Sequence, residues 1–189
     1  GLTVVDMPTP QSVAIFGHAG IDRNHPDFFA AFILNTILGG QGIESRLTAE
    51  VREKRGLTYG ISTVLISKDQ ANVMLGQVAS ANDRINAAIE VIRDEWRKLA
   101  RDGVTAEELQ AAQTYLTGAY PLRFDGNSQI SRILVGMQRI GLGLDYINNR
   151  NAKINAVTLS EINRVAVQLL KPEALNFVVA GQPTGLKEE

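Results

Sequence analysis

The feature that most restricts the fold of this sequence is a pair of β-rich runs separated by a short linker. The runs are LTYGISTVLI at residues 57–66 and ANVMLGQVA at residues 71–79. The linker Ser67 to Gln70 has hairpin length and is far too short for the crossover between parallel strands. Directly afterwards, apolar residues recur at the spacing of one helix face: Ile85, Ile89, Ile92, Trp96 and Leu99. A hairpin followed by an amphipathic helix favours an antiparallel sheet covered by helices.

Two further β-rich runs, QSVAIF at residues 11–16 and LNFVVA at residues 175–180, each predict a short strand. Because several helical patterns lie between the hairpin and the last run, we expect an α+β fold. It would have a largely antiparallel sheet of about four strands, with helices packed on one face. The chain has 189 residues, of which 44% are hydrophobic, and no linker or repeat divides it. We therefore expect one domain over residues 1–189, since a chain of this size buries roughly 70% of its unfolded surface.

Capping residues and glycines mark the expected helix boundaries. We predict a deeply buried helix that is capped by Asn24 and ended by Gly39 and Gly40. A short amphipathic helix over residues 44–54 should turn Leu47 and Val51 inward and end at Gly56. Capping boxes are expected at three later helix starts: Ser80–Asp83, Thr105–Glu108 and Thr158–Glu161. One more stripe at helical spacing consists of Ile130, Ile133, Leu134, Met137 and Ile140.

Composition excludes several classes of function. The 19 Lys and Arg residues against 20 Asp and Glu give a net charge of −1, whereas nucleic-acid-binding domains usually carry a basic excess. An RNA-binding sheet would also need exposed aromatic residues on adjacent strands, and Tyr59 is the one aromatic residue in the two central strands. No apolar run is long enough to span a membrane. The absence of cysteine excludes disulfides, cysteine zinc sites and thiol catalysis.

Local motifs for metal binding or nucleophilic catalysis are missing. His18 and His25 are not part of an H-x-x-E-H or H-x-x-x-H motif, so we expect loop histidines and no metal site. The glycines Gly39, Gly40 and Gly42 follow a helix and not a strand, so they favour a turn over a phosphate-binding loop. No G-x-S-x-G elbow is present. A chain that begins with Gly1 and not Met is expected to be a mature fragment or an excised domain.

The remaining candidate is the block LGGQGIESRLTAEVREKRGLTY at residues 38–59. By itself it predicts a short helix that ends in basic residues, a glycine and a strand with an aromatic residue. Arg52 near a helix C-terminus interacts favourably with the helix dipole. Tyr59 suits a strand by its β propensity. The residue types alone therefore favour a purely structural interpretation of both.

This block, however, resembles the second-half domain of the pitrilysin-like zinc peptidases, which include insulysin, the mitochondrial processing peptidase and many bacterial homologues. The matching pattern is L-G-G-x-G-x-x-S-R-L-x-x-x-V-R-E-K-x-G-L-x-Y. The similarity extends over nearly the whole chain. It includes the opening PQSVAIFGHAGIDRNHPDFFAAFILNTILGG, the helix entry GVTAEEL at residues 103–109 and the closing LNFVVAG at residues 175–181.

The resemblance implies that this chain is the C-terminal, non-zinc half of a larger peptidase. In that family the zinc motif, H-x-x-E-H with a distal Glu, lies in the first-half domain, and it is absent here. We therefore expect no cofactor in this chain, zinc in a first-half partner domain or subunit, and no activity of the isolated chain. A heterodimer or a homodimer is compatible with the family, because the halves of some bacterial members are separate chains.

The resemblance also assigns roles to two residues. Arg52 and Tyr59 match an Arg and a Tyr that project into a chamber enclosed with the first half. Arg52 would bind the backbone of the peptide substrate, and the catalytic Tyr59 would support substrate and the oxyanion that develops at the scissile carbonyl. Arg46 is expected in a surface or interdomain salt bridge. Arg55 occupies a variable position and receives no role.

A second hypothesis from another class is a catalytically inactive structural or scaffold subunit of the same family. The intact Arg52 and Tyr59 pair favours the peptidase. An H-x-x-E-H motif elsewhere in the reading frame, or in its neighbour, would discriminate the two. Peptide specificity cannot be derived from this chain, since the chamber would also be shaped by the missing half. Bacterial relatives occur in the periplasm and in the cytoplasm, and the absence of cysteine fits either.

Overall fold

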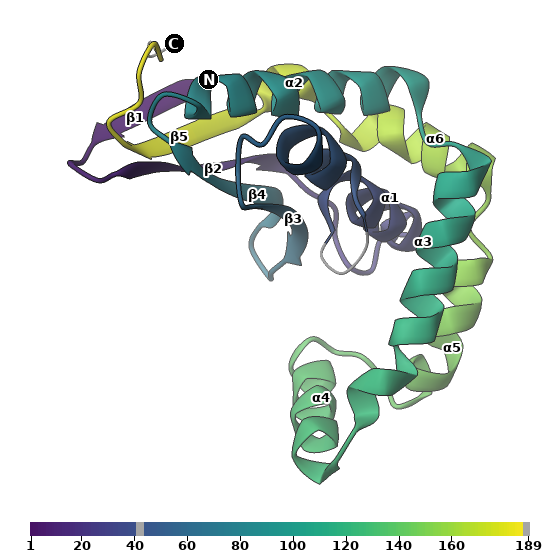
Figure 1. Ribbon diagram of the computed structural model, residues 1–189. Coiled ribbons are helices and arrows are strands. Elements are labelled where there is room, and N and C mark those ends of the chain that lie inside the picture. Colours follow the sequence, from purple (N-terminus) through teal and green to yellow (C-terminus); the bar gives the residue numbers. More distant parts are fainter. Residues whose placement is uncertain (41–43, 187–189) are drawn as a thin grey trace.

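A five-stranded sheet is the framework of the computed structural model, which describes residues 1–40 and 44–186 (Figure 1). The strands are β1 (Leu2–Asp6), β2 (Gln11–Ala19), β3 (Gly60–Ser67), β4 (Asn72–Ala81) and β5 (Asn176–Gly181). Their spatial order is β1-β5-β2-β4-β3, and every neighbouring pair is antiparallel except β1 with β5. The predicted α+β class, the largely antiparallel sheet and the β3–β4 hairpin are confirmed.

β1 is a strand that the sequence patterns did not predict, so the sheet has five strands and not four. It pairs in parallel with β5, with Leu2 opposite Phe177 and Asp6 opposite Gly181. The amino group of Gly1 also donates to the carbonyl of Leu175, 174 residues along the chain. A five-residue strand carries little periodic signal, and this one exists only through a partner at the other end of the sequence.

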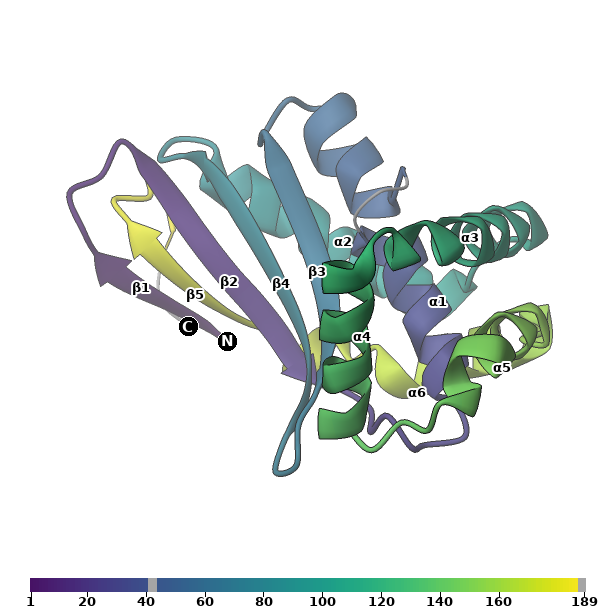
Figure 2. The same ribbon diagram turned by 90° about the horizontal axis from the view of Figure 1, so that it is seen from below.

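Helices cover one face of the sheet and continue beyond the β3 edge. Within the described residues the chain forms six α-helices: α1 (Phe28–Gly39), α2 (Ile85–Asp102), α3 (Ala106–Ala119), α4 (Asn127–Arg139), α5 (Asp145–Asn155) and α6 (Leu159–Leu169). α1 and α2 contact the sheet, and α6 packs on both. α3 and α5 lead away from the sheet, and α4 lies below its other face (Figures 1 and 2). None of the described helices is long and apolar enough to cross a bilayer.

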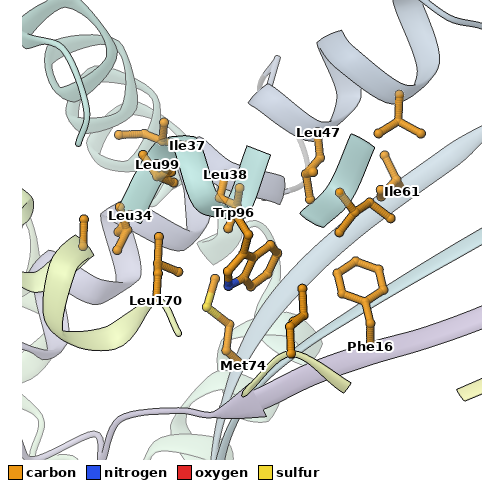
Figure 3. Close-up of a cluster of buried hydrophobic side chains, with 14 of the residues drawn as sticks. Phe16, Leu34, Ile37, Leu38, Leu47, Ile61, Met74, Trp96, Leu99 and Leu170 are labelled. Carbon is orange, nitrogen blue, oxygen red and sulfur yellow. The ribbon is translucent and has the colours of Figure 1, made fainter. Parts of the chain in front are cut away.

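The core centres on Trp96 of α2, whose side chain is completely buried (Figure 3). Its ring meets Phe16 of β2 edge-on at a centroid distance of 5.9 Å, and Phe16 stacks on Phe177 at 5.2 Å. Gly76 of β4 lies opposite Phe16, and a Cβ there would come within 2.3 Å of that ring. The helical stripe predicted around Trp96 is thus confirmed as the face that packs on the sheet.

Two of the three predicted capping boxes are confirmed, at the starts of α3 and α6. The side chains of Thr105 and Thr158 each accept a hydrogen bond from the backbone N–H of a Glu three residues later. Those residues, Glu108 and Glu161, accept in return from the backbone N–H of the two threonines. Each helix start therefore satisfies donors that would otherwise have no intrahelical partner.

The capping box predicted at Ser80–Asp83 is wrong. β4 continues to Ala81, and α2 begins at Ile85 without a side-chain cap. The polar side chains have tertiary partners instead, since the Ser80 hydroxyl donates to the Leu57 carbonyl at 2.5 Å. The side-chain amide of Asn82 likewise donates to the carbonyl of Thr9.

The cap predicted at Asn24 is also wrong, because α1 begins at Phe28 with Asp27 at the N-cap position. Asp27 makes no capping hydrogen bond. Its carboxylate accepts two hydrogen bonds from Arg164 of α6, at 2.6 and 2.9 Å. The burial predicted for α1 and its end at Gly40 are confirmed.

His18 lies within β2 and is buried, so the expectation of a loop histidine is wrong for it. Its Nε2 accepts a hydrogen bond from the indole N–H of Trp96 at 2.9 Å, and its Nδ1 lies 2.7 Å from the carbonyl oxygen of Ala19. A carbonyl only accepts and an indole N–H only donates, so the ring is the neutral tautomer with its proton on Nδ1. Burial lowers the pKa of His18, and Lys171 adds to this, against the opposing effects of the Ala19 hydrogen bond and Glu173.

We predict that His18 makes the fold less stable on mild acidification. Its pKa when folded lies below the ordinary value of 6.5, so the unfolded chain takes up the proton first as the pH falls. The free energy of unfolding should be full above pH 6.5 and then fall, by at most about 1.4 kcal/mol per pH unit. Urea unfolding between pH 7.5 and 5 measures this slope.

The variant His18→Gln should lose that slope, because it no longer carries an imidazole beside Trp96. The control His25→Gln removes the other histidine and should keep the slope. A slope that is equal in wild type and His18→Gln would contradict the assignment.

Candidate functional site

The segment that carries Arg52 is a π-helix, Thr48–Glu53. The backbone N–H of Lys54 donates to the carbonyl of Ala49 at 2.9 Å, which is the five-residue spacing of this helix type. The predicted helix over residues 44–54 is therefore present in a shorter form, over residues 46–53, and with a wider turn. Leu47 and Val51 are completely buried, as predicted. Such π-helical turns are rare in proteins, and those that do occur are often found at functional sites.

Gly56 ends this helix, as predicted, and turns the chain toward β3. Its φ of +61° lies in the left-handed region, where glycine is favoured because it has no Cβ. The backbone N–H of Gly56 donates to the carbonyl of Arg52, and that of Leu57 donates to the carbonyl of Val51, both at 2.9 Å. These bonds satisfy carbonyls at the end of the helix and fix its direction relative to β3.

The backbone on either side of Tyr59 is anchored, while its side chain projects freely. The hydroxyl of Thr58 donates to the carbonyl of Ala79 at 2.5 Å and accepts from the backbone N–H of Gly60 at 3.0 Å. Gly60 then begins β3, slightly later than the predicted residue 57. The side chain of Tyr59 is 92% exposed, so it makes little contribution to packing.

Two of the basic residues near Arg52 are held by one carboxylate. Lys54 Nζ lies 2.5 Å and Arg55 Nη1 lies 2.6 Å from the side-chain oxygens of Glu50. Hydrogen bonds from Lys54 and then from Arg55 lower the pKa of Glu50 to about 2. The guanidinium of Arg55 is therefore already paired with a carboxylate of the same segment.

Arg46 forms a forked ion pair with Glu108 of α3. Its Nε and Nη2 donate to the two carboxylate oxygens at 2.6 and 2.7 Å, and Nη2 also donates to the carbonyl of Gly103. Burial raises the pKa of Glu108, but its hydrogen bonds with Arg46 and Thr105 together outweigh burial and leave the pKa lowered. The expected salt bridge of Arg46 thus lies within this chain and joins the π-helix to α3.

Arg52 differs from these neighbours. Its side chain is about half exposed, and its ion pair is with the adjacent Glu53, with 3.3 Å between Nε and Oε1. Arg52 and Tyr59 both line a pocket of about 530 Å³ at the junction of the π-helix, β3 and β4. The two residues singled out in the sequence therefore meet at one surface pocket with their polar groups available.

Over residues 1–40 and 44–186, no group of three or more His, Cys, Asp or Glu side chains could hold a metal ion. His18 already uses both ring nitrogens, and His25 is an exposed residue beside Asp27 at 3.9 Å. The described part of the chain does not fit a zinc site. Of the glycine cluster, Gly39 and Gly40 end α1, and Gly42 lies outside the described residues.

Patterns in the sequence gave no sign of Arg150 of α5, which lines two further cavities near α1 and α4. The arginines around it come from segments between residues 23 and 150, so no local motif brings them together. This region could be identified only from the partners of each charged side chain, and these partners are known only from the fold.

Comparison with protein-family models gives a match over residues 1–116 to "Peptidase M16 inactive domain". An uncharacterized zinc protease of Mycobacterium tuberculosis (strain ATCC 25618 / H37Rv) is 32% identical over 171 residues, which are 89% of this chain and 38% of that protein. The uncharacterized zinc protease YmxG of Bacillus subtilis is 29% identical over 167 residues, 85% of this chain and 39% of that one. The "Non-peptidase homolog YmxG" of Helicobacter pylori is 24% identical over 161 residues, covering 85% and 37%.

Solved structures agree with the fold. The peptidase M16 inactive domain from Pseudomonas fluorescens matches with a TM-score of 0.86 and 27% identity, covering 99% of this chain and 44% of that chain. The inactive peptidase domain of a zinc protease from Bordetella parapertussis matches with a TM-score of 0.75 over 93% and 94%. Its 14% identity shows the fold alone. The chain spans less than half the length of the curated relatives it matches.

We predict that the Arg46–Glu108 ion pair stabilises the fold by holding the π-helix, Thr48–Glu53, against α3. Both side chains are mostly buried, so Arg46→Ala leaves a carboxylate without its partner and should cost about 1–3 kcal/mol of unfolding free energy. Arg46→Lys should recover part of this loss, because it keeps the charge without the fork. Urea unfolding at pH 7 measures both.

The matched control is Arg97→Ala, which removes an ion pair with Asp94 that is more than half exposed on both sides. It should leave the unfolding midpoint nearly unchanged, since exposed pairs contribute little. Equal effects of Arg46→Ala and Arg97→Ala would argue against a structural role for the fork.

Proposed function

Because the chain belongs to the peptidase M16 inactive-domain family, we propose that residues 1–189 form the second-half, non-zinc domain of a zinc metallopeptidase. In this proposal the chain binds peptide substrate through Arg52 and Tyr59. A zinc-bearing first-half domain, on the same longer polypeptide or on a partner subunit, supplies the metal. The length of the relatives supports this, because the chain corresponds to 38–39% of two of them.

The observation that carries the proposal is the contrast between Tyr59 and its surroundings. A tyrosine that is 92% exposed does little for folding, yet Thr58 and Gly60 fix the backbone on both sides of it. An anchored backbone with an exposed phenol is the arrangement expected of a group that acts on a ligand, because the backbone position is fixed while the hydroxyl stays available for binding.

The charges beside it support the same interpretation. Arg46, Lys54 and Arg55 are bound by Glu108 and Glu50, whereas the ion pair of Arg52 among the described residues is the weak, exposed contact with Glu53. An exposed ion pair of this kind contributes little and is easily exchanged for another acceptor. Arg52 can therefore turn its donors to a ligand without disturbing the fold.

The two side chains suit an extended peptide. The guanidinium of Arg52 carries several fixed N–H donors and is always charged, so it can bind backbone carbonyl oxygens. The hydroxyl of Tyr59 would donate a hydrogen bond to the oxygen of the scissile carbonyl, on which negative charge develops during hydrolysis. A single donor placed at such an oxygen contributes roughly 10²–10³ in rate.

Zinc does not fit the described residues, so we assign the metal to the first-half domain. The isolated chain should neither bind zinc stoichiometrically nor hydrolyse peptides. Its contribution is to bind and orient the substrate and to donate the hydrogen bond from Tyr59.

We predict that Arg52 and Tyr59 affect peptide cleavage differently once the zinc-bearing half is present. Tyr59→Phe should lower kcat about 10²-fold, because the lost donor acts on the transition state. Arg52→Ala should raise KM about tenfold, because it binds the substrate backbone before and during reaction. Steady-state cleavage of a fluorogenic peptide by the complete protein separates the two effects.

Arg55→Ala is the matched control, since it removes a neighbouring arginine whose partner is Glu50. It should leave both constants nearly unchanged. If Arg52→Ala and Tyr59→Phe retain wild-type kcat/KM, the proposed roles are wrong. Tyr59→Phe should also unfold at the wild-type temperature, because its side chain is almost fully exposed.

A catalytically inactive scaffold is the second candidate, and one observation favours it. The Helicobacter pylori relative carries the name "Non-peptidase homolog", so this family includes proteins described as lacking peptidase activity. The remainder of the reading frame and its neighbouring frame decide between the two candidates. The absence of an H-x-x-E-H motif in both, together with no cleavage by the complete protein, would favour the scaffold.

A further inference from the structure

Two cavities of about 510 Å³ each meet at Arg150 of α5. The upper cavity lies between α1, β3 and α3. The lower cavity lies between α1, α5 and α4, the helix seen below the sheet in Figure 1. Phe32, Tyr120, Arg123 and Arg150 line both cavities. They therefore form two parts of one hollow surface.

Arg150 is a buried charge without an acidic partner among the residues that the structure describes. Its side chain is among the buried polar groups, at 6% exposure. Nη1 donates to the carbonyl of Leu116 and to the side chain of Asn151, both at 3.1 Å, and the guanidinium lies 4.2 Å from the ring centroid of Tyr120. Within the described ranges, no carboxylate forms an ion pair with it. Burying a charge without a counter-ion is costly, so an anion that enters from a cavity would be bound favourably.

The walls of the lower cavity extend this positive charge. Its described lining contains no Asp or Glu, and it contains five arginines: Arg23, Arg123, Arg132, Arg139 and Arg150. None of the five forms an ion pair with a described residue, whereas other arginines of the chain do. Those with carboxylate partners include Arg46, Arg55, Arg97, Arg101 and Arg164. Five arginines without a described ion pair are thus gathered at one cavity, although the chain as a whole is nearly neutral.

The upper cavity is uncharged apart from the shared arginines. Ile15, Val64 and Leu75 contribute apolar walls from the sheet. Two further lining residues, Asn35 and Thr63, are more than nine-tenths buried, and Asn35 Oδ1 and Thr63 Oγ1 have no hydrogen-bond partner among the described residues. Both atoms are themselves covered, so the polar groups that a ligand in this cavity can reach are those of less buried lining residues such as Ser62 and Gln77. Amide groups beside small apolar side chains, as in a peptide, fit such walls.

We propose that the two cavities together bind an acidic stretch of peptide, with a carboxylate held by Arg150 and Arg123 and the adjoining uncharged residues in the upper cavity. The forked guanidinium matches a carboxylate in geometry as well as in charge. This rests on the proposed function in one respect, namely that the ligand is a peptide, and it adds a preference for acidic residues.

The location of the cavities relative to Tyr59 predicts how far the acidic residue lies from the peptide bond that is cleaved. Tyr59 directly precedes β3, Ser62 to Val64 line the upper cavity, and Leu65 lines the lower one. At about 3.3 Å per residue, the upper cavity spans roughly 10–17 Å along the strand from Tyr59, and the lower cavity begins at roughly 20 Å, so Arg123 and Arg150, which line both, lie roughly 17–20 Å away. An extended peptide rises by a similar amount per residue. The acidic group would therefore lie about five or six residues from the bond that is cleaved.

Binding to the 189-residue chain alone tests the proposal without any need for catalysis. The probes are four fluorescent dodecapeptides, with Glu-Glu or Gln-Gln at the same two positions and with a free or an amidated C-terminus. Fluorescence anisotropy at low and at high salt gives Kd. We expect the acidic peptides to bind at least about tenfold more tightly than the neutral ones at low salt, with the difference reduced by salt. The two C-termini distinguish a side-chain carboxylate from a terminal one.

Arg150→Gln and Arg123→Gln should each weaken binding of the acidic peptide about tenfold or more, and Arg97→Gln, which is remote on α2, should not. Arg123 is an exposed side chain, so its variant tests the site even if Arg150→Gln fails to fold. Equal Kd values for acidic and neutral peptides, or wild-type binding by a folded Arg123→Gln, would overturn the proposal. Failure of cleavage with intact acidic binding would instead count against the proposed function and leave the cavities as a peptide site.

Discussion

The burial of the Trp96 indole is the constraint on which the arrangement of sheet and helices depends. Its ring fills the space between α2 and the sheet, edge-on to Phe16, and this close contact requires a glycine at Gly76. Its N–H also needs an acceptor, because a buried donor without a partner is costly. His18 supplies that acceptor only as the neutral tautomer. Packing and hydrogen bonding thus fix the same contact, and through it the position of α2 over β2 and β4.

The candidate site follows a different rule, in which the backbone is fixed and the side chains are free. Hydrogen bonds from Thr58 and Ser80 hold the start of β3, and the Arg46–Glu108 fork holds the π-helix against α3. Between these anchors, Arg52 and Tyr59 project from the surface with little to stabilise them. A site built in this way loses little backbone entropy on binding, because the framework is already ordered when a ligand or a partner domain arrives.

The distribution of charge partners separates the structural arginines from the others. Arg46 and Arg164 join elements of the fold through a carboxylate partner, in Glu108 and in Asp27. The arginines around the cavities at Arg150 have no such partner in the described part of the chain, although the whole chain carries a net charge of only −1. Near-neutrality therefore conceals a local excess of positive charge. It still argues against a broad nucleic-acid surface, since the excess is confined to the hollow around Arg150.

Much of the fold could be predicted from the sequence, because strong local patterns agreed with the tertiary structure. Several elements depend on residues that lie close in sequence. They are the hairpin, the stripe around Trp96, the capping boxes at Thr105 and Thr158, and the end of the π-helix at Gly56. The predicted cap at Ser80–Asp83 failed for the opposite reason, since Ser80 and Asn82 found partners far away in the chain. In the candidate site, the spacing of Arg52 and Tyr59 was visible, but their common pocket was not.

The sequence by itself determined the class of fold, the family resemblance and the residue types of the candidate site, because these depend on short-range periodicity and an ordered motif. Only the tertiary structure decided that Leu2–Asp6 is a strand, that His18 is a buried hydrogen-bond acceptor and that Arg46 forms an ion pair within this chain. The same holds for the gathering of unpaired arginines around Arg150. Each of these depends on a partner far away in sequence. A side chain's charge and donors are set by its type, but whether they are satisfied is set by what the fold brings beside it.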